Sequence, residues 1–261
     1  MPKVFPIRAV KYLNKNIAGI YNMDFSSLDF LVYSSHKTST QSLLTILEVN
    51  NYKARHCHAI QTLKLTLNLD HPVQKEQFIQ YLLNYKIKNN KKIKILSCIR
   101  NPKDRLISSF FQSFHTDEIE FGNKKKNDTT ITVKSEDELI TMYEELIKKN
   151  HIPGNTESLD ELSFILNINV LELLKKKEDY YYLDHNLFEL YVLDFNSIIN
   201  NTINLKYLNN ILNLDLKVLK TSNLSKNKSY YNKYKNVKKN LGKKLDSIIE
   251  NQYNTFYFTA F

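Results

Sequence analysis

Two polar stretches follow apolar, strand-like runs and carry side chains that suit an anionic ligand. The first, SSHKTSTQS at 34–42, sets Lys37 beside His36 among hydroxyl residues. The second, RNPKDRLISS at 100–109, begins with Arg100 and places Ser108 on the helix expected after it. Helix N-termini, basic side chains and hydroxyl donors are typical of phosphate and sulfate sites. We therefore expect a ligand with two separated anionic groups.

Both stretches have alternatives. A hydroxyl-rich helix cap would account for one or two of the serines and threonines, but not for Lys37. A Walker A loop does not fit, because residues 34–42 contain no glycine and the lysine precedes the hydroxyl residues. No partner carboxylate for magnesium is evident, so we expect a site without a metal. For Arg105, a salt bridge or a helix-face charge is as good an explanation as a role in the site.

The elements that must position these side chains alternate along the chain. Short apolar runs that are rich in β-branched and aromatic residues predict strands, and the segments between them have helical periodicity. This alternation predicts a parallel sheet with right-handed crossovers. Ligands of open parallel sheets bind beyond the carboxyl ends of the strands, where both polar stretches would lie. The predicted strands are 30–35, 52–60 and 91–99, and the predicted helices are 39–51, 73–90 and one that begins at Pro102.

The remainder of the chain is predicted to be mostly helical. Residues 1–28 have the pattern of an irregular arm, and residues 115–160 begin as a polar excursion. One more strand is predicted at 188–195, and a long basic stretch at 231–261 is helical before an aromatic end. Further helices are predicted at 136–150, 158–166, 168–184 and 205–214.

Composition sets limits on the class of protein. The chain has 261 residues, 42% of them hydrophobic, which is ordinary for a globular protein, and we expect a single domain over 1–261. Its net charge of +10 suits an anionic partner, although an AT-rich genome would also enrich Lys, Asn, Ile and Tyr. Cys57 and Cys98 are too few for a disulfide framework or a zinc site. Because no long apolar segment or signal peptide is evident, we expect a cytoplasmic protein without a transmembrane segment.

The two stretches together resemble the donor-binding motifs of sulfotransferases. SSHKTSTQSLLTIL is similar to the loop that binds the 5′-phosphosulfate, with Ser39 where that family has glycine. RNPKDRLISSFF is similar to the RNPxxRxxS motif that binds the 3′-phosphate. They occur in the family's order, each after a strand, about 60 residues apart. The resemblance covers residues 29–114 well, and the rest of the chain only in outline.

The resemblance implies a fold, a donor and a set of binding residues. The fold would be the α/β fold of P-loop NTPase-like sulfotransferases, a central parallel β-sheet flanked by helices, with a mostly helical C-terminal half. The donor would be 3′-phosphoadenosine 5′-phosphosulfate, with 3′,5′-bisphosphoadenosine as product and no metal required. Lys37 would stabilise the leaving phosphate, and Arg100 and Ser108 would hold the 3′-phosphate. The expected donor-binding residues are His36, Lys37, Thr38, Ser39, Thr40, Gln41, Ser42, Arg100 and Ser108.

A base that takes the proton of the acceptor hydroxyl is expected in ARHCHAI, residues 54–60. His56 and His58 would share one face of a strand, and neutral histidine suits this role near pH 7. The family resemblance favours His58 first and His56 second. A structural histidine or an incomplete metal pair is the alternative for either.

The acceptor is expected to be a hydroxyl of a carbohydrate, such as a capsule, lipopolysaccharide or other glycan. Residues 29–114 would form the donor-binding core, 115–185 the acceptor side, and 186–261 the late strand and basic C-terminal helices. No nucleic-acid partner is expected. The alternatives are a nucleotide-dependent kinase with a degenerate phosphate loop, and a non-catalytic basic module that binds anionic polymers.

Overall fold

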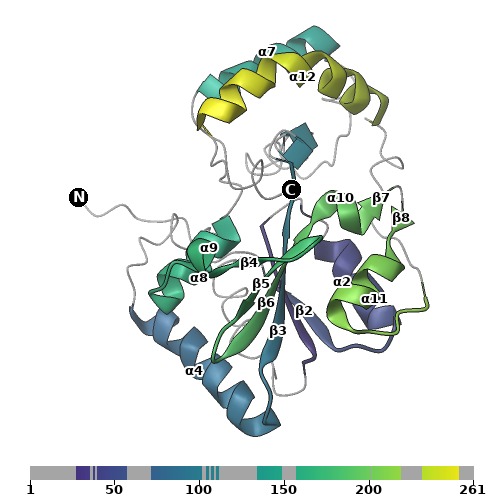
Figure 1. Ribbon diagram of the computed structural model, residues 1–261. Helices are drawn as coiled ribbons and strands as arrows, with labels where there is room; N and C mark the ends of the chain where they lie inside the picture. The colour runs from purple at the N-terminus through teal and green to yellow at the C-terminus, as the bar shows by residue number, and fades with distance from the viewer. Residues whose placement is uncertain are drawn as a thin grey trace, which may run out of the picture.

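A six-stranded sheet forms the centre of the computed structural model, with helices on both of its faces (Figure 1). The strand order is β2-β1-β3-β6-β5-β4. The strands are β1 (Phe30–Tyr33), β2 (Ala54–Cys57), β3 (Ile93–Ile99), β4 (Lys175–Lys176), β5 (Tyr180–Asp184) and β6 (Phe188–Asp194). The structure describes residues 28–35, 38, 40–57, 72–101, 104–105, 107–108, 110–111, 134–148, 157–200, 202–218 and 231–252.

The sheet is mixed, with a mostly parallel core. β1 pairs in parallel with β2 and β3, and β3 pairs in parallel with β6. β5 runs antiparallel to β6, and β4 runs antiparallel to β5. The expectation of a central parallel sheet flanked by helices therefore holds for four strands, whereas the edge formed by β5 and β4 departs from it.

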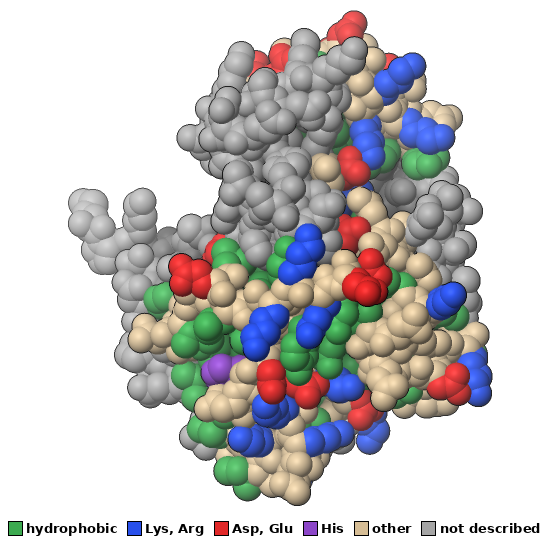
Figure 2. Space-filling view, in the orientation of Figure 1, with side chains coloured by type: hydrophobic (Ala, Val, Ile, Leu, Met, Phe, Trp, Pro, Cys, Tyr) green, Lys and Arg blue, Asp and Glu red, His purple; other side chains and the backbone are tan. Residues whose placement is uncertain are grey.

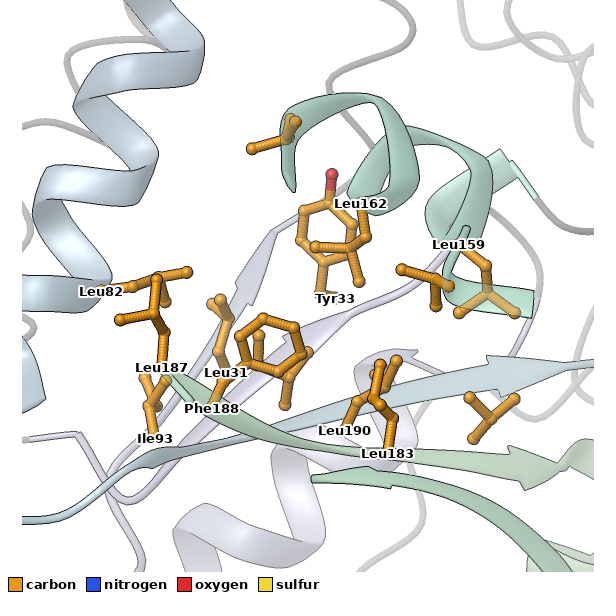
Figure 3. Close-up of a cluster of buried hydrophobic side chains, with 14 of the residues drawn as sticks. Leu31, Tyr33, Leu82, Ile93, Leu159, Leu162, Leu183, Leu187, Phe188 and Leu190 are labelled. Atoms are coloured by element: carbon orange, nitrogen blue, oxygen red, sulfur yellow. The ribbon is translucent and has the colours of Figure 1, made fainter. Parts of the chain in front are cut away.

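Alternation along the strands supplies the two faces of the core. Leu31 and Tyr33 of β1 pack on the side of α4 (Pro72–Asn89), α8 (Glu157–Leu166) and α9 (Val170–Leu173). Phe30 and Val32 pack on the side of α2 (Thr40–Val49) and α11 (Leu205–Leu212). Because successive strand residues point to opposite faces, a run that is apolar at every position indicates a strand covered on both sides. Figure 3 shows part of the cluster on the α8 side.

The helix predicted at 168–184 is wrong for most of its length. Only α9 is helical, and the chain then forms β4 and β5. Tyr181 and Leu183 pack into the α8-side cluster, whereas Tyr180 and Tyr182 pack against the opposite one. This period of two, in aromatic residues that favour strands, outweighs the helical pattern of the lysines before it. The C-terminal half consequently supplies β4, β5 and β6 and is less helical than expected.

Asparagine ends four of the helices. Asn51, Asn90, Asn167 and Asn213 have positive φ angles of 66°, 50°, 55° and 52°, and they follow α2, α4, α8 and α11. Helices commonly end on a residue with left-handed backbone geometry, usually glycine and sometimes asparagine. With four glycines in the whole chain, asparagine takes this position here.

Two helices lie beyond the carboxyl end of the sheet. α7 (Glu136–Lys148) and the long basic α12 (Tyr231–Gln252) pack side by side there (Figure 1). A third apolar cluster joins them to Ile107, Phe110 and Phe111, which follow β3 in the chain. Lys238 of α12 lies 2.7 Å from Asp104. The buried residues of this cluster are Ile107, Phe110, Phe111, Leu139, Tyr143, Val237 and Leu241.

Two short elements complete the described structure. α10 (Phe195–Ile198) follows β6 directly, and a small hairpin of β7 (Ile199–Asn200) and β8 (Thr202–Ile203) leads into α11. The predicted strand at 188–195 ends one residue early because Asp194 caps α10: its Oδ2 accepts from the backbone N–H of Ser197 at 2.9 Å. No helix in the described ranges is both long and apolar enough to cross a membrane.

Candidate anion-binding site

The strand order reverses at β1 and β3, and the term crevice refers here to the region beyond the carboxyl ends of these two strands. From β1 the chain passes through α2 to β2 on one side, and then through α4 to β3 on the other side of β1. In an open α/β sheet, ligands bind at such a reversal, outside the carboxyl ends of the strands. The two loops that flank this point begin at Ser34 and Arg100. These are the two stretches that the sequence had singled out.

Ser34 joins the two loops through its side chain. The backbone ladder between β1 and β3 ends at Val32 and Leu96. Beyond it, Ser34 Oγ donates to Cys98 O at 2.9 Å and accepts from Cys98 N at 3.0 Å. The Ser34 hydroxyl thus takes the place of the β1 backbone as the hydrogen-bond partner of β3. The N–H and C=O of Cys98 therefore stay paired although β1 has ended.

The corner between β1 and α2 is polar yet closed to solvent. Ser34, Ser35, Thr38 and Thr40 are between 0% and 5% exposed. Thr38 Oγ1 lies 2.7 Å from Ser34 Oγ and donates to Ser35 O at 2.6 Å. Ser35 Oγ is buried and has no hydrogen-bond partner among the described residues. A buried hydroxyl without a described partner, in the corner that precedes α2, fits a site that accepts an anion.

Arg100 stands at the opposite side of the crevice. Its Cζ lies 4.3 Å from the centre of the Phe195 ring, at the point where β6 passes into α10. Stacking engages the faces of a guanidinium, whereas its N–H groups donate in the plane of the group. The contact with Phe195 therefore restrains the Arg100 side chain next to the start of α10. The sequence had not singled out Phe195.

The helical residues after Arg100 are partly described. Arg105 N donates to Asn101 O at 2.9 Å, the spacing of an α-helical turn. Arg105 is 2% exposed, so its side chain does not lie on a solvent-exposed helix face. Ser108 is helical and half-buried. Ile107 and Phe111 on the same segment pack against α7 and α12, which fixes the segment from the other side.

His56 of β2 lies next to the first turn of α2. Its Nδ1 is 3.3 Å from Gln41 Nε2 in α2. This contact restrains the imidazole ring next to the first turn of α2. Gln41 and half-buried Ser42 are described, whereas His36, Lys37, Ser39 and His58 lie outside the described residues.

The buried polar side chains of the described residues lie at or next to the carboxyl ends of the parallel strands. Residues with charged side chains are almost never fully buried unless they are paired. The sequence had not singled out the members on β3, α8 and β6. For Glu161 the sequence held a signal, because a charged residue occurs there on the face of α8 that also carries Ser158, Leu162 and Ile165. The set comprises Ser34, Ser35, Thr38, Thr40, Ser97, Arg105, Ser158, Glu161 and Asp194.

Comparisons with protein-family models, curated proteins and solved structures gave no match. Among the described residues, no group of three His, Cys, Asp or Glu side chains is placed to hold a metal ion.

Proposed function

We propose that the protein is a sulfotransferase that moves a sulfuryl group from 3′-phosphoadenosine 5′-phosphosulfate to a hydroxyl of a carbohydrate. The observation that carries the proposal is the pairing of β1 with β3, extended by Ser34 to Cys98. It sets the hydroxyl-rich corner and the Arg100 loop across one crevice. A donor with anionic groups at two positions of its nucleotide fits such a pair of loops.

The residues of the crevice fit this donor. The corner offers the N-terminus of α2 and the hydroxyl of Ser35, which is buried without a described partner. When bound, the donor would supply a sulfuryl group attached to its 5′-phosphate, which is the leaving group. Lys37 would place a positive charge beside that phosphate, and positioning with charge stabilisation accounts for most of the catalysis expected in such transfers.

The second loop would hold the 3′-phosphate. Arg100, oriented by Phe195, would make charge-assisted hydrogen bonds to it, and Ser108 would donate a further one. His58 is the proposed base for the acceptor proton because the resemblance favours it, and His56, which contacts Gln41, is the second choice. The carbohydrate acceptor rests on the resemblance and on the many tyrosine and lysine side chains of the chain. An acceptor in a capsule, lipopolysaccharide or other glycan remains part of the proposal.

A nucleotide-dependent kinase is the second candidate, and Asp194 favours it. This buried carboxylate ends β6 beside Ile99 of β3, close to the Arg100 loop. It supplies the carboxylate that the sequence seemed to lack for magnesium. Its Oδ2, however, accepts from the backbone N–H and the hydroxyl of Ser197. A role as a helix cap therefore explains the position of Asp194 without a metal.

The third candidate, a basic module for anionic polymers, requires a surface of one charge. On the face shown in Figure 2, basic side chains alternate with acidic ones over the described part of the molecule. Mixed charges of this kind do not create the strong positive field that attracts a polyanion. This face therefore gives the third candidate no support.

Thermal shift and calorimetry with 3′,5′-bisphosphoadenosine test the proposal. We expect stabilisation without a metal, and little effect of ATP with magnesium. Arg100→Ala should weaken binding about 10- to 100-fold, the value of a charge-assisted hydrogen bond. Arg55→Ala is the matched control, because Arg55 is an exposed arginine of β2. Lys37→Ala should also weaken binding.

Three results would change the assignment. The absence of any shift with saturating bisphosphate would overturn the sulfotransferase proposal. A metal-dependent shift with ATP alone would favour the kinase, and then Asp194→Asn should abolish it. Equal losses in Arg100→Ala and Arg55→Ala would show that general charge, and not the Arg100 loop, binds the ligand.

A further inference from the structure

α8 packs on the face of the sheet opposite α2 and contacts both strands that lead into the two loops. Glu161 Oε2 accepts from the hydroxyl of Tyr33, the last residue of β1, at 2.5 Å. One turn earlier, Ser158 Oγ lies 3.1 Å from Ser97 Oγ of β3. Figure 3 shows the Tyr33 ring directed toward α8, beside Leu162. Each of the two loops is thus preceded by a strand residue bound to this one helix.

Burial of the Glu161 carboxylate against Tyr33 costs free energy, so stability alone does not explain the contact. Glu161 is 8% exposed and lies on a helix face formed by Leu159, Leu162 and Ile165 together with the buried Ser158. A carboxylate in such a layer must be hydrogen-bonded, and even paired buried charges are often no more stabilising than apolar side chains of similar size. A leucine at position 161 would continue the stripe. Packing therefore does not explain why the chain has a carboxylate at this point.

The location of the contact suggests its purpose. Tyr33 is completely buried and immediately precedes Ser34 and Ser35 of the anion-binding corner. A phenol fixed to a carboxylate has one preferred position, whereas an apolar ring can slide along an apolar face. Ser34 is attached to β3 through Cys98. Together these two attachments leave the corner little freedom relative to Arg100.

We propose that Glu161 and Ser158 are positioning residues for the two anion-binding loops. Glu161 acts through Tyr33 on the β1–α2 corner, and Ser158 acts through Ser97 on the Arg100 loop. The inference deepens the proposed function and rests on it, because it assumes that both loops bind one ligand. It also links the donor site to the segment 115–185 that is expected to form the acceptor side, since α8 belongs to that segment.

A pair of tyrosine variants separates positioning from stability. Tyr33→Phe removes the hydroxyl that binds Glu161. Tyr85→Phe removes a similar buried hydroxyl on the same face of the sheet, which donates to Leu28 O at 2.6 Å, before the amino end of β1. Both variants lose one buried hydrogen bond, so both should unfold at lower urea concentration. Only Tyr33→Phe should weaken binding of 3′,5′-bisphosphoadenosine, by about tenfold.

Variants of Glu161 test the same contact from the other side. Glu161→Gln keeps an oxygen that can accept from Tyr33, so its dissociation constant should stay within about threefold of the wild-type value. Glu161→Leu removes the acceptor and should weaken binding as much as Tyr33→Phe does. If Glu161→Leu does not fold, the comparison of Tyr33→Phe with Tyr85→Phe still decides. Calorimetry on the full chain gives the dissociation constants.

Each outcome has a separate meaning. Wild-type binding with equal constants for Tyr33→Phe and Tyr85→Phe would overturn the positioning role and leave the proposed function intact. A wild-type chain that binds no bisphosphoadenosine would overturn both. A selective loss in Tyr33→Phe and Glu161→Leu, with Glu161→Gln near wild type, is the expected result.

Discussion

Ser34→Ala is the sharpest test of how the crevice is built. The Ser34 hydroxyl is completely buried and is bound to both the N–H and the C=O of Cys98. Alanine fits the same space but leaves those two backbone groups of β3 unpaired on that side. The substitution therefore removes the side-chain extension of the β1–β3 ladder, together with the 2.7 Å contact of Ser34 Oγ with Thr38 Oγ1.

The expected loss of stability follows from those two groups. A buried backbone group left without a partner costs about 1–3 kcal/mol. With two such groups, and with the desolvation of the serine itself removed, we expect a net loss of about 3 kcal/mol in the free energy of unfolding. For a urea dependence near 3 kcal/mol per molar, this lowers the midpoint by about 1 M. Bisphosphoadenosine should also bind more weakly, because the corner is no longer fixed to β3.

Urea unfolding followed by circular dichroism measures the loss, and Ser163→Ala is the matched control. Ser163 Oγ also connects two backbone groups, donating to Leu159 O at 2.8 Å and accepting from Val170 N at 3.0 Å. It is only half-buried, so water can replace it, and we expect a loss near 1 kcal/mol with unchanged ligand binding. A Ser34→Ala midpoint equal to that of Ser163→Ala would refute the reasoning.

Two further predictions concern alkaline pH and α12. Burial first, and then the charge of Asp194, raises the pKa of Cys98 from its usual 9.0 to about 12, and burial also raises that of Tyr85 from 10.0 to about 12. Unfolding releases these protons above pH 9, so the urea concentration at the midpoint should decrease as the pH is raised from about 9 to 12. The decrease should be less steep in Tyr85→Phe. A midpoint that does not change with pH would contradict this prediction. In α12, Val237→Ala should lower the free energy of unfolding by about 2 kcal/mol, because Val237 is completely buried. Lys238→Ala removes a partly exposed ion pair with Asp104 and should lower it by less than about 1 kcal/mol. Equal midpoints in urea for the two variants would show that the apolar contact does not hold α12.

The strand and helix pattern of residues 30–99 could be predicted from the sequence because local signals agree there. β1 and β3 are apolar on both faces, and Pro72 begins α4. The hairpin of β4 and β5 could not be predicted from the sequence. Its three lysines continue the helical pattern of the residues before them, and the run of tyrosines follows without a clear break. Its structure depends on pairing with β6, a contact across the sheet that helical periodicity does not record.

The candidate site was predictable only in part, for a related reason. The hydroxyl, lysine and arginine residues follow strands directly, so their type and place in the chain indicated an anion site. Glu161 and Phe195 reach the crevice from elements that are distant in sequence. A charged residue on an apolar helix stripe indicates a buried partner, but the sequence does not identify Tyr33 as that partner.

The asparagines that end α2, α4, α8 and α11 have an evolutionary consequence. Glycine codons are rich in guanine and asparagine codons in adenine, so drift toward AT removes the usual helix terminator and supplies its substitute. A chain under this pressure can change much of its sequence while keeping the same backbone at the ends of its helices. Sequence divergence from proteins of balanced composition can therefore exceed structural divergence at these turns.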